Sequence, residues 1–183
     1  MRAPSRSALA ALVLILPVAC GDDDGGLPPG DDAGLEEVFQ PFFDPLGLEF
    51  TYGGVVDYRD GKHLQLYVEP AGPATDQQYL DRLVSSSRAI VPFLFDEFPE
   101  LDTFDICQEP VPSGPGDADR PEPRTVVLLS REQAASVADW STATLADLLR
   151  ASRVGGGGGV KVDDAIAALP AYVEADAAAE APA

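Results

Sequence analysis

The residue types that could carry out catalysis are few in this chain and lie far apart. Its 183 residues include two cysteines, Cys20 and Cys107, and a single histidine, His63. A cysteine acts as a nucleophile or a metal ligand through its thiolate, which a neighbouring base or positive charge must favour. Any chemistry that needs an imidazole as a general base or a metal ligand therefore depends on His63.

Six polar side chains would share one surface if the strands that carry His63 and Cys107 lie near each other. They are His63, Tyr67, Glu69, Asp105, Cys107 and Glu109. A Cys-His-Asp triad or a zinc site can be drawn from them, but no nucleophile motif surrounds Cys107, and the close ligand pairs of most zinc sites are lacking. We therefore expect an exposed His63 and a buried, unreactive Cys107, with the thiol pKa raised by the charge of Asp105. We expect no catalytic residue, no metal ion and no cofactor.

The N-terminus has the features of an export signal. Arg2 and Arg6 precede the apolar run Ala8–Ala19, which is about as long as the core of a signal peptide. The run is shorter than the roughly 20 apolar residues that cross a bilayer as a helix. Residues 1–19 are therefore predicted to be a signal peptide.

Cys20 stands at the boundary between this run and the segment GDDDGGLPPGDDAG. The residues Val18-Ala19-Cys20-Gly21 resemble the lipobox of bacterial lipoproteins, although Pro17 occupies the position where that family prefers leucine. The resemblance implies that the Cys20 thiol receives a diacylglycerol and becomes the first residue after cleavage. The alternative is a signal that stays uncleaved or is cut elsewhere.

The chain is strongly acidic, with 31 Asp and Glu residues, 12 Lys and Arg residues and a formal net charge of -19. Such a surface repels phosphate backbones and anionic lipid headgroups, which argues against nucleic acid as a partner and against electrostatic attachment to a membrane. The aspartates of residues 20–34 lack the spacing and the distal glutamate of an EF-hand loop. This segment is therefore predicted to be a flexible tether rather than a calcium site.

The body of the chain begins with an amphipathic helix and a hairpin. The apolar positions of the helix are Leu35, Val38, Phe39 and Phe42. Strands are predicted over residues 49–58 and 62–69, with Asp60-Gly61 as the turn signal between them. Apolar and polar residues alternate in the second strand, with Leu64, Leu66 and Val68 on one face. This alternation indicates a sheet that is covered on one face only.

A long helix and two further strands follow the hairpin. Thr75 and Gln78 fit a capping box, which predicts that a helix begins there. Strands are predicted over residues 103–108 and 124–130. The unbroken apolar run Val126–Leu129 predicts that the last of these strands is buried on both faces.

Two short helices complete the predicted domain. Ser130 opens the first of them in a second capping box, and residues 142–152 form the other. Together these elements predict an α+β domain over residues 35–154, in which a four-stranded, mainly antiparallel sheet packs against helices on one face. Residues 155–183 begin with a glycine run that lacks the G-K-[ST] of a phosphate-binding loop, so they are predicted to be a linker and a largely disordered tail.

One long connection stands out between the third and fourth strands. The segment Pro110–Pro123, PVPSGPGDADRPEP, is rich in proline, glycine and charge. Loops of this length inside a domain are usually mobile or functional. Its composition favours a mobile connection, and the alternative is an arm that binds a partner.

The lipobox-like start, the acidic spacer and segments such as HLQLYVEP and FPELDTFDICQEP resemble uncharacterised lipoproteins of actinobacterial type. Only Cys20 has a counterpart at the level of a motif, and no activity comes with the resemblance. We expect an exported protein held at the outer face of the cell membrane by acyl chains on Cys20, whose domain is a non-catalytic module for binding or envelope interaction. The alternatives are a cell-envelope enzyme that uses the surface around His63 and Cys107, and a purely structural spacer.

Overall fold

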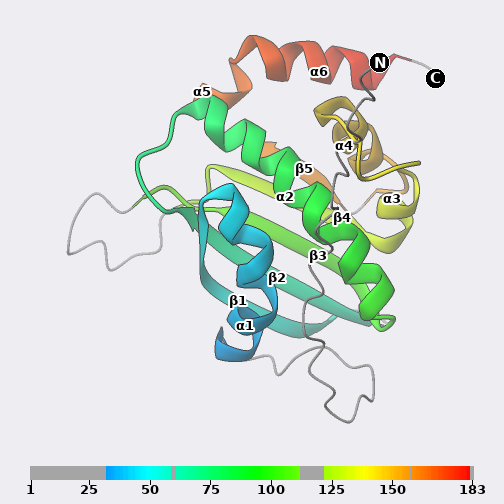
Figure 1. Cartoon of the computed structure of the whole chain (residues 1–183). Coiled ribbons are helices and arrows are strands. Elements are labelled where there is room, and N and C mark those ends of the chain that lie inside the picture. The colour runs from blue at the N-terminus through cyan, green and yellow to red at the C-terminus, as the bar shows by residue number, and fades with distance from the viewer. Residues whose placement is uncertain (1–31, 59–60, 112–121, 157, 182–183) are drawn as a thin grey trace, which may run out of the picture.

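A computed structural model of the chain describes residues 32–58, 61–111, 122–156 and 158–181 (Figure 1). The helices are α1 (Asp32–Phe43), α2 (Asp76–Glu97), α3 (Arg131–Ala135), α4 (Leu145–Ser152), α5 (Asp164–Ala167) and α6 (Pro170–Glu180), with a 3-10 turn η1 (Asp44–Leu46) after α1. The strands are β1 (Leu48–Tyr58), β2 (Gly61–Pro70), β3 (Leu101–Gln108), β4 (Thr125–Ser130) and β5 (Gly159–Val162). The predicted signal peptide, Cys20 and most of the predicted tether lie outside the described residues, as do residues 112–121 of the Pro110–Pro123 connection.

The prediction of an α+β fold is confirmed, but the sheet differs in strand number and direction. It contains five strands in the order β1-β2-β3-β4-β5, and β2 pairs with β3 in parallel while the other neighbours are antiparallel. The parallel pair arises because α2 returns the chain along the sheet before β3 begins (Figure 1). The sheet is therefore mixed rather than mainly antiparallel with four strands.

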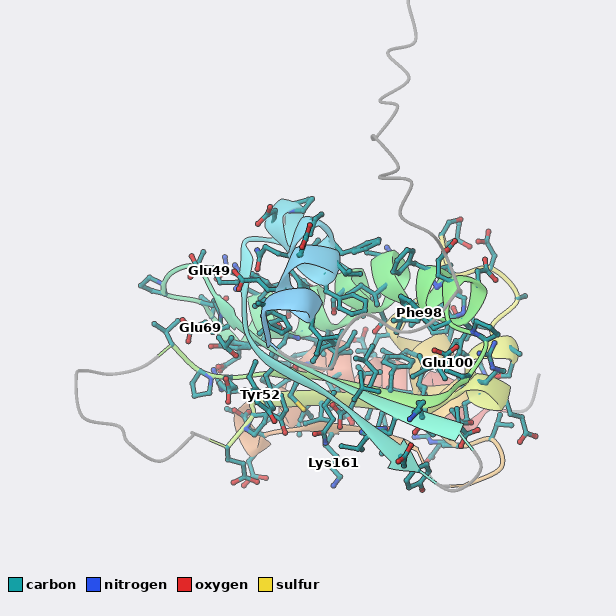
Figure 2. All side chains as sticks on the ribbon, turned by 90° about the horizontal axis from the view of Figure 1, so that it is seen from below. Glu49, Tyr52, Glu69, Phe98, Glu100 and Lys161 are labelled. Atoms are coloured by element: carbon teal, nitrogen blue, oxygen red, sulfur yellow. The ribbon has the colours of Figure 1, made fainter. Side chains whose placement is uncertain are left out.

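Helices α1 and α2 lie on the same side of the sheet and cover its inner face (Figure 2). The inner residues of β2 are fully buried, whereas the side chains between them are only partly buried. The buried inner positions of the sheet are Leu64, Leu66, Val68, Phe104, Ile106, Val127 and Leu129. The predicted one-sided burial of β2 is thus confirmed. We call the other side of the sheet, toward which Lys161 points in Figure 2, the open face.

Both predicted capping boxes are present. Thr75 Oγ1 accepts a hydrogen bond from the Gln78 amide, and the Gln78 side chain accepts one from the Thr75 amide, which fixes the start of α2. Ser130 and Gln133 do the same for α3. The second closing helix begins three residues later than predicted, at Leu145, because Thr144 rather than an earlier residue caps it.

The prediction that the fourth strand is buried on both faces is wrong. The side chains of β4 alternate between buried and partly buried along the strand. Val126 and Leu128 belong to the open face, where they lie opposite Cys107 and Asp105 of β3. An unbroken apolar run does not reveal that helices cover only one of its two faces.

The C-terminal segment also differs from its prediction as a linker and a disordered tail. Gly159–Val162 forms β5 on the edge of β4, and two helices follow it. Ile166 is fully buried in a second apolar cluster with Tyr79 and Leu80 of α2. The signals in the sequence were short, a four-residue strand and an alanine-rich helix. Tertiary contacts hold these elements in place, because β5 pairs with β4, α5 packs against α2, and α6 packs against α4.

The hairpin of β1 and β2 is confirmed, with one irregularity that matters for the open face. Tyr58 pairs with Gly61, so residues 59 and 60, which lie outside the described part of the chain, connect the strands. The register shifts by one residue between Phe50 and Tyr52, a β-bulge. Because of this shift Leu48 faces the core, and Glu49 faces the open side opposite Glu69.

Candidate functional site

The strand register arranges the open-face side chains in rows that run across the sheet. One row consists of Tyr52, Tyr67, Cys107, Val126 and Lys161, each opposite the next in a neighbouring strand. The neighbouring rows contain Gln65 with Asp105 on one side, and Glu49 with Glu69 on the other. The six side chains that the sequence placed on one surface therefore lie on one face of β2, β3 and the residue that follows β3, with His63 near the start of β2 and Glu69 near its end. Glu49 and Tyr52 of β1 join them there.

His63 is held at both ring nitrogens. Its Nδ1 lies 2.8 Å from Thr103 Oγ1, and its Nε2 lies 3.3 Å from Asp105 Oδ2. The side chains of His63 and Asp105 are only 12% and 13% exposed, and the Tyr58 ring lies 6.0 Å from the imidazole. The prediction of an exposed histidine is therefore wrong, because the neighbouring strand β3 supplies a hydroxyl and a carboxylate that fix the ring.

Cys107 is buried, as predicted. Its side chain lies in contact with Asp105, with 3.8 Å between Sγ and Oδ1. Burial, followed by the negative charge of Asp105, raises the pKa of Cys107 to about 12. The thiolate that nucleophilic or metal-binding chemistry requires is therefore scarce at neutral pH.

The order of the three groups also differs from that of a Cys-His-Asp triad. In such a triad the imidazole lies between the nucleophile and the carboxylate, so that it can accept the proton of the nucleophile. Here the Asp105 carboxylate contacts both the Cys107 thiol and the His63 ring. Asp105 therefore stabilises the protonated thiol instead of orienting a base toward it.

Three carboxylates gather where β1, β2 and β3 meet at one end of the open face. Glu49 lies directly opposite Glu69, and Glu109 follows β3, where its amide donates to the carbonyl oxygen of Val68 at 2.8 Å. The Glu109 side chain is only 5% exposed and accepts a hydrogen bond of 2.9 Å from Thr51 Oγ1. Burial, and then the charges of Glu49 and Glu109, raise the pKa of Glu69 above its ordinary value. This end of the sheet therefore has a locally concentrated negative potential.

Sequence reasoning found Glu69 and Glu109 but missed Glu49 and Tyr52. If residue pairs are counted back from the turn without a bulge, Tyr52 lies opposite Tyr67. The turn signal alone was therefore sufficient to place Tyr52 on the open face. The same count places Glu49 opposite Pro70, on the core side. Only the bulge moves Glu49 to the open face, and nothing in the sequence marks that bulge.

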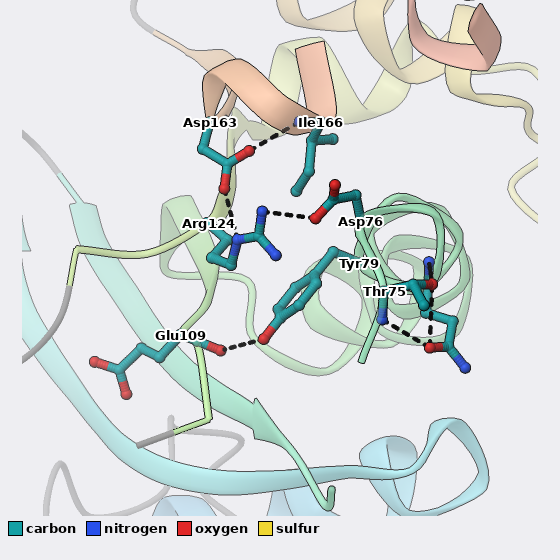
Figure 3. Close-up of polar contacts among 8 residues, drawn as sticks. Thr75, Asp76, Tyr79, Glu109, Arg124, Asp163 and Ile166 are labelled. Carbon is teal, nitrogen blue, oxygen red and sulfur yellow. Dashed lines mark hydrogen bonds and ion pairs between the residues drawn. The ribbon is translucent and has the colours of Figure 1, made fainter. Parts of the chain in front are cut away.

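Arg124 lies at the centre of a polar cluster outside the open face (Figure 3). Its Nε lies 2.5 Å from Asp163 Oδ2, its Nη2 lies 2.9 Å from Asp76 Oδ1, and its guanidinium carbon lies 4.7 Å from the centre of the Tyr79 ring. Asp163 also caps α5 by accepting from the Ile166 amide. Arg124 therefore joins β4, α2 and the C-terminal helices, which is a structural role.

A hollow of about 740 Å³ opens beside this cluster, between β4, β5 and α5. Its lining includes the basic groups Arg124 and Lys161 together with the acidic groups Glu122, Asp163 and Asp164. The two carboxylates on Arg124 neutralise that guanidinium, and the remaining charges are of mixed sign. The hollow therefore has no clear preference for either an anionic or a cationic ligand.

Within the described residues, no group of three or more His, Cys, Asp and Glu side chains is arranged to hold a metal ion. Over the same residues, none of the helices is both long and apolar enough to pass through a bilayer. In comparisons with known proteins, no protein-family model, no curated protein and no solved structure matches this chain. The function must therefore be argued from the residues themselves, and the open face is the surface on which their chemistry is concentrated.

Proposed function

We propose that this protein is an exported lipoprotein, anchored by acyl chains on Cys20 to the outer face of the cell membrane, and that its α+β domain binds an envelope component through the open face of the sheet. The observation that carries the binding part is the one-sided coverage of the sheet. Tyr52 and Val56, which are 38% and 48% exposed, both belong to the open face of β1. Large apolar side chains exposed together on one face are typical of an interaction surface.

The anchoring part is supported by the position of Cys20 between the apolar run and the acidic spacer. Each buried CH₂ of an acyl chain contributes about 0.8 kcal/mol to membrane binding, and stable anchoring takes more than one chain. A diacylglycerol supplies two chains. The net charge of -19 would not by itself hold the body at an anionic bilayer, so a lipid is the means of attachment that suits this composition.

Binding is favoured over catalysis by the chemistry of the open face. The pKa of about 12 at Cys107 and the position of Asp105 between Cys107 and His63 oppose a thiolate nucleophile. The alternative proposal, an envelope enzyme that uses His63 and Cys107, predicts that Cys107→Ala abolishes an activity. The binding proposal predicts that Cys107→Ala leaves ligand binding unchanged.

The anchor is tested by metabolic labelling with radioactive palmitate and by intact-mass analysis of the wild type and Cys20→Ala. We expect the wild type to carry label and to partition with membranes, and the variant to lose both. Equal mass and equal partitioning of the two proteins would contradict the anchor.

The binding surface is tested by photo-crosslinking in cells from two positions of similar exposure. A photoreactive amino acid at Val56 probes the open face, and one at Val173 of α6, which is 55% exposed, is the matched control. We expect a discrete adduct from position 56 and none, or a different one, from position 173. Identical adducts, or none from position 56, would remove the support for the open face.

A further inference from the structure

The acidic end of the open face lies next to its aromatic row. Glu49 and Glu69 face each other across β1 and β2, and Tyr52 and Tyr67 form the neighbouring cross-strand pair. Figure 2 shows Glu49, Glu69 and Tyr52 at the same end of the sheet. Side chains on one face of a strand recur at every second residue, about 7 Å apart, so one bound side chain can reach both rows.

This arrangement places like charges where a sheet would favour opposite ones. Directly opposed carboxylates destabilise an antiparallel pair. Among the residues that the structure describes, Glu49 and Glu69 have no Lys or Arg partner within ion-pair distance. The raised pKa of Glu69 reports the same repulsion, since the charges of Glu49 and Glu109 contribute to it after burial. A cation placed between these groups would relieve the repulsion.

The tyrosine rings add a second attraction for a cation. The Tyr52 and Tyr67 rings meet edge to face, with their centres 5.7 Å apart, and Tyr52 is 38% exposed. Lysine and arginine bind to the faces of aromatic rings, and their aliphatic stems cover apolar surface while the charged head stays near carboxylates. The combination of carboxylates and rings therefore suits a lysine or arginine side chain better than a bare ion.

We propose that the open face docks a polypeptide segment of a partner protein, and this inference rests on the proposed function. The segment bears a lysine or arginine, and its cationic side chain lies between Glu49 and Glu69 and against the ring of Tyr52. The choice of partner follows from charge complementarity, because the chain carries a formal net charge of -19 and this end of the sheet concentrates carboxylates.

The segment is placed on the face rather than on the edge of the sheet. Beside Glu49, the edge of β1 is already covered by Gln40 of α1. The Phe50 amide donates to Gln40 Oε1 at 2.7 Å, and Gln40 Nε2 donates to the Leu48 carbonyl at 3.1 Å. Strand addition at this part of the edge would have to displace both hydrogen bonds.

The proposal is tested with the full chain in mild detergent and a short fluorescent peptide in which lysine alternates with valine. The same peptide with acetylated lysines is the neutral control, and binding is measured by fluorescence anisotropy at about 0.15 M salt, where distant charges are screened. We expect Glu49→Gln/Glu69→Gln to weaken binding about threefold to tenfold. The matched variant Glu36→Gln/Glu37→Gln removes the same charge from exposed positions of α1 and should change the affinity less than about twofold.

The tyrosine contact has its own pair of variants. Tyr52→Phe keeps the ring and should keep the affinity, whereas Tyr52→Ala should weaken binding about threefold. Thermal unfolding of each variant confirms that it is folded, and Glu49→Gln/Glu69→Gln should unfold at a higher temperature than the wild type because it removes like-charge repulsion.

Several outcomes would overturn the proposal. They are equal binding of the acetylated peptide, equal losses of affinity in the α1 and open-face variants, and displacement of the peptide by spermidine or Ca²⁺ at concentrations that match the dissociation constant of the peptide.

The crosslink from position 56 separates this proposal from the proposed function. An adduct whose contact segment lacks lysine and arginine would overturn the cationic partner and leave the binding surface intact, whereas the absence of an adduct would count against the surface itself.

Discussion

At the scale of single residues, Cys107 shows how the place of a thiol in a sheet raises its pKa. Its side chain is 4% exposed, and the neighbouring carboxylate accepts from the thiol. Desolvation and the charge of Asp105 both favour the neutral form. The sequence was enough to predict this environment, because Asp105 and Cys107 are two residues apart on one strand and must share a face.

Thiol labelling tests this environment in a Cys20→Ala background, in which Cys107 is the remaining cysteine. Because the pKa rises from 9.0 to about 12, the thiolate fraction near neutral pH should be about 1,000-fold lower in the folded than in the unfolded chain. We expect iodoacetamide to modify Cys107 only after denaturation. Asp105→Asn should make labelling of the folded protein faster, and rapid labelling of the folded parent would contradict the burial of this thiol.

Glu69 is a second residue of the open face whose charged form is disfavoured in the folded protein. Its pKa is raised by burial, then by Glu49 and Glu109, so the folded state binds a proton more readily than the unfolded state. Below the ordinary value of 4.5 the group is neutral in both states and has no effect on stability. As the pH rises through the raised pKa, stability is lost.

Glu69→Gln should therefore stabilise the fold at neutral pH by about 0.5 kcal/mol, and this gain should vanish in acid. Urea unfolding of the wild type and the variant across this pH range provides the measurement. Glu36→Gln, which removes the same charge from an exposed position of α1, is the control. A gain that grows as the pH falls would show that the sign of the Glu69 shift is wrong.

At the scale of elements, the sequence predicted what local patterns encode and missed what neighbouring strands decide. Both capping boxes and the alternation of β2 are local, and they were confirmed. The parallel pairing of β2 with β3, the bulge near Glu49 and the short strand β5 depend on contacts between distant segments. The candidate site was therefore predicted along β2 and β3 but was incomplete on β1.

The glycine run shows this difference most clearly, because the sequence suggests a linker, whereas the glycines of the run that the structure describes lie in specific conformations and contacts. Gly155 and Gly156 have φ values of 67° and 72°, which favour glycine. A Cβ on Gly158 would lie 2.1 Å from Gln133 Oε1 and 2.6 Å from the Leu128 carbonyl oxygen. Gln133 cannot move freely, since its Nε2 donates to the carbonyls of Ser152 and Val154.

Gly158→Ala should therefore destabilise the protein by about 2 kcal/mol or more, through overpacking against a buried side chain and a backbone carbonyl. Gly159→Ala is the matched control, because a Cβ there meets nothing within 4 Å, and it should change stability by less than about 0.5 kcal/mol. Chemical denaturation of both variants checks the prediction. Equal effects of the two substitutions would mean that this stretch is the linker that its composition suggests.

At the scale of the whole molecule, the inner face of the sheet carries the core, and the open face is the surface that we propose for recognition. Helices α1 and α2 bury the inner face, and the C-terminal segment completes the sheet with β5 and fixes one end of α2 through the Arg124 cluster (Figures 1 and 3). The open face carries polar and aromatic rows, and the opposed carboxylates of Glu49 and Glu69 in these rows reduce stability. A domain that binds through this face depends on the remaining contacts to keep the sheet intact.

Truncation after Val154 tests whether the C-terminal segment is part of the folded unit. It removes β5, the cap at Asp163 and the fully buried Ile166, so we expect a loss of about 4 kcal/mol or more, which approaches the total stability of a small domain. Because a truncated chain can fail to fold for several reasons, two point variants make the test specific.

Ile166→Ala should cost about 3 kcal/mol by opening a cavity against Tyr79 and Leu80, whereas Val173→Ala at an exposed position of α6 should cost less than about 0.5 kcal/mol. Equal unfolding midpoints for Ile166→Ala and Val173→Ala, together with an unchanged midpoint after truncation, would mean that the domain ends at α4 and that the sheet is complete with four strands.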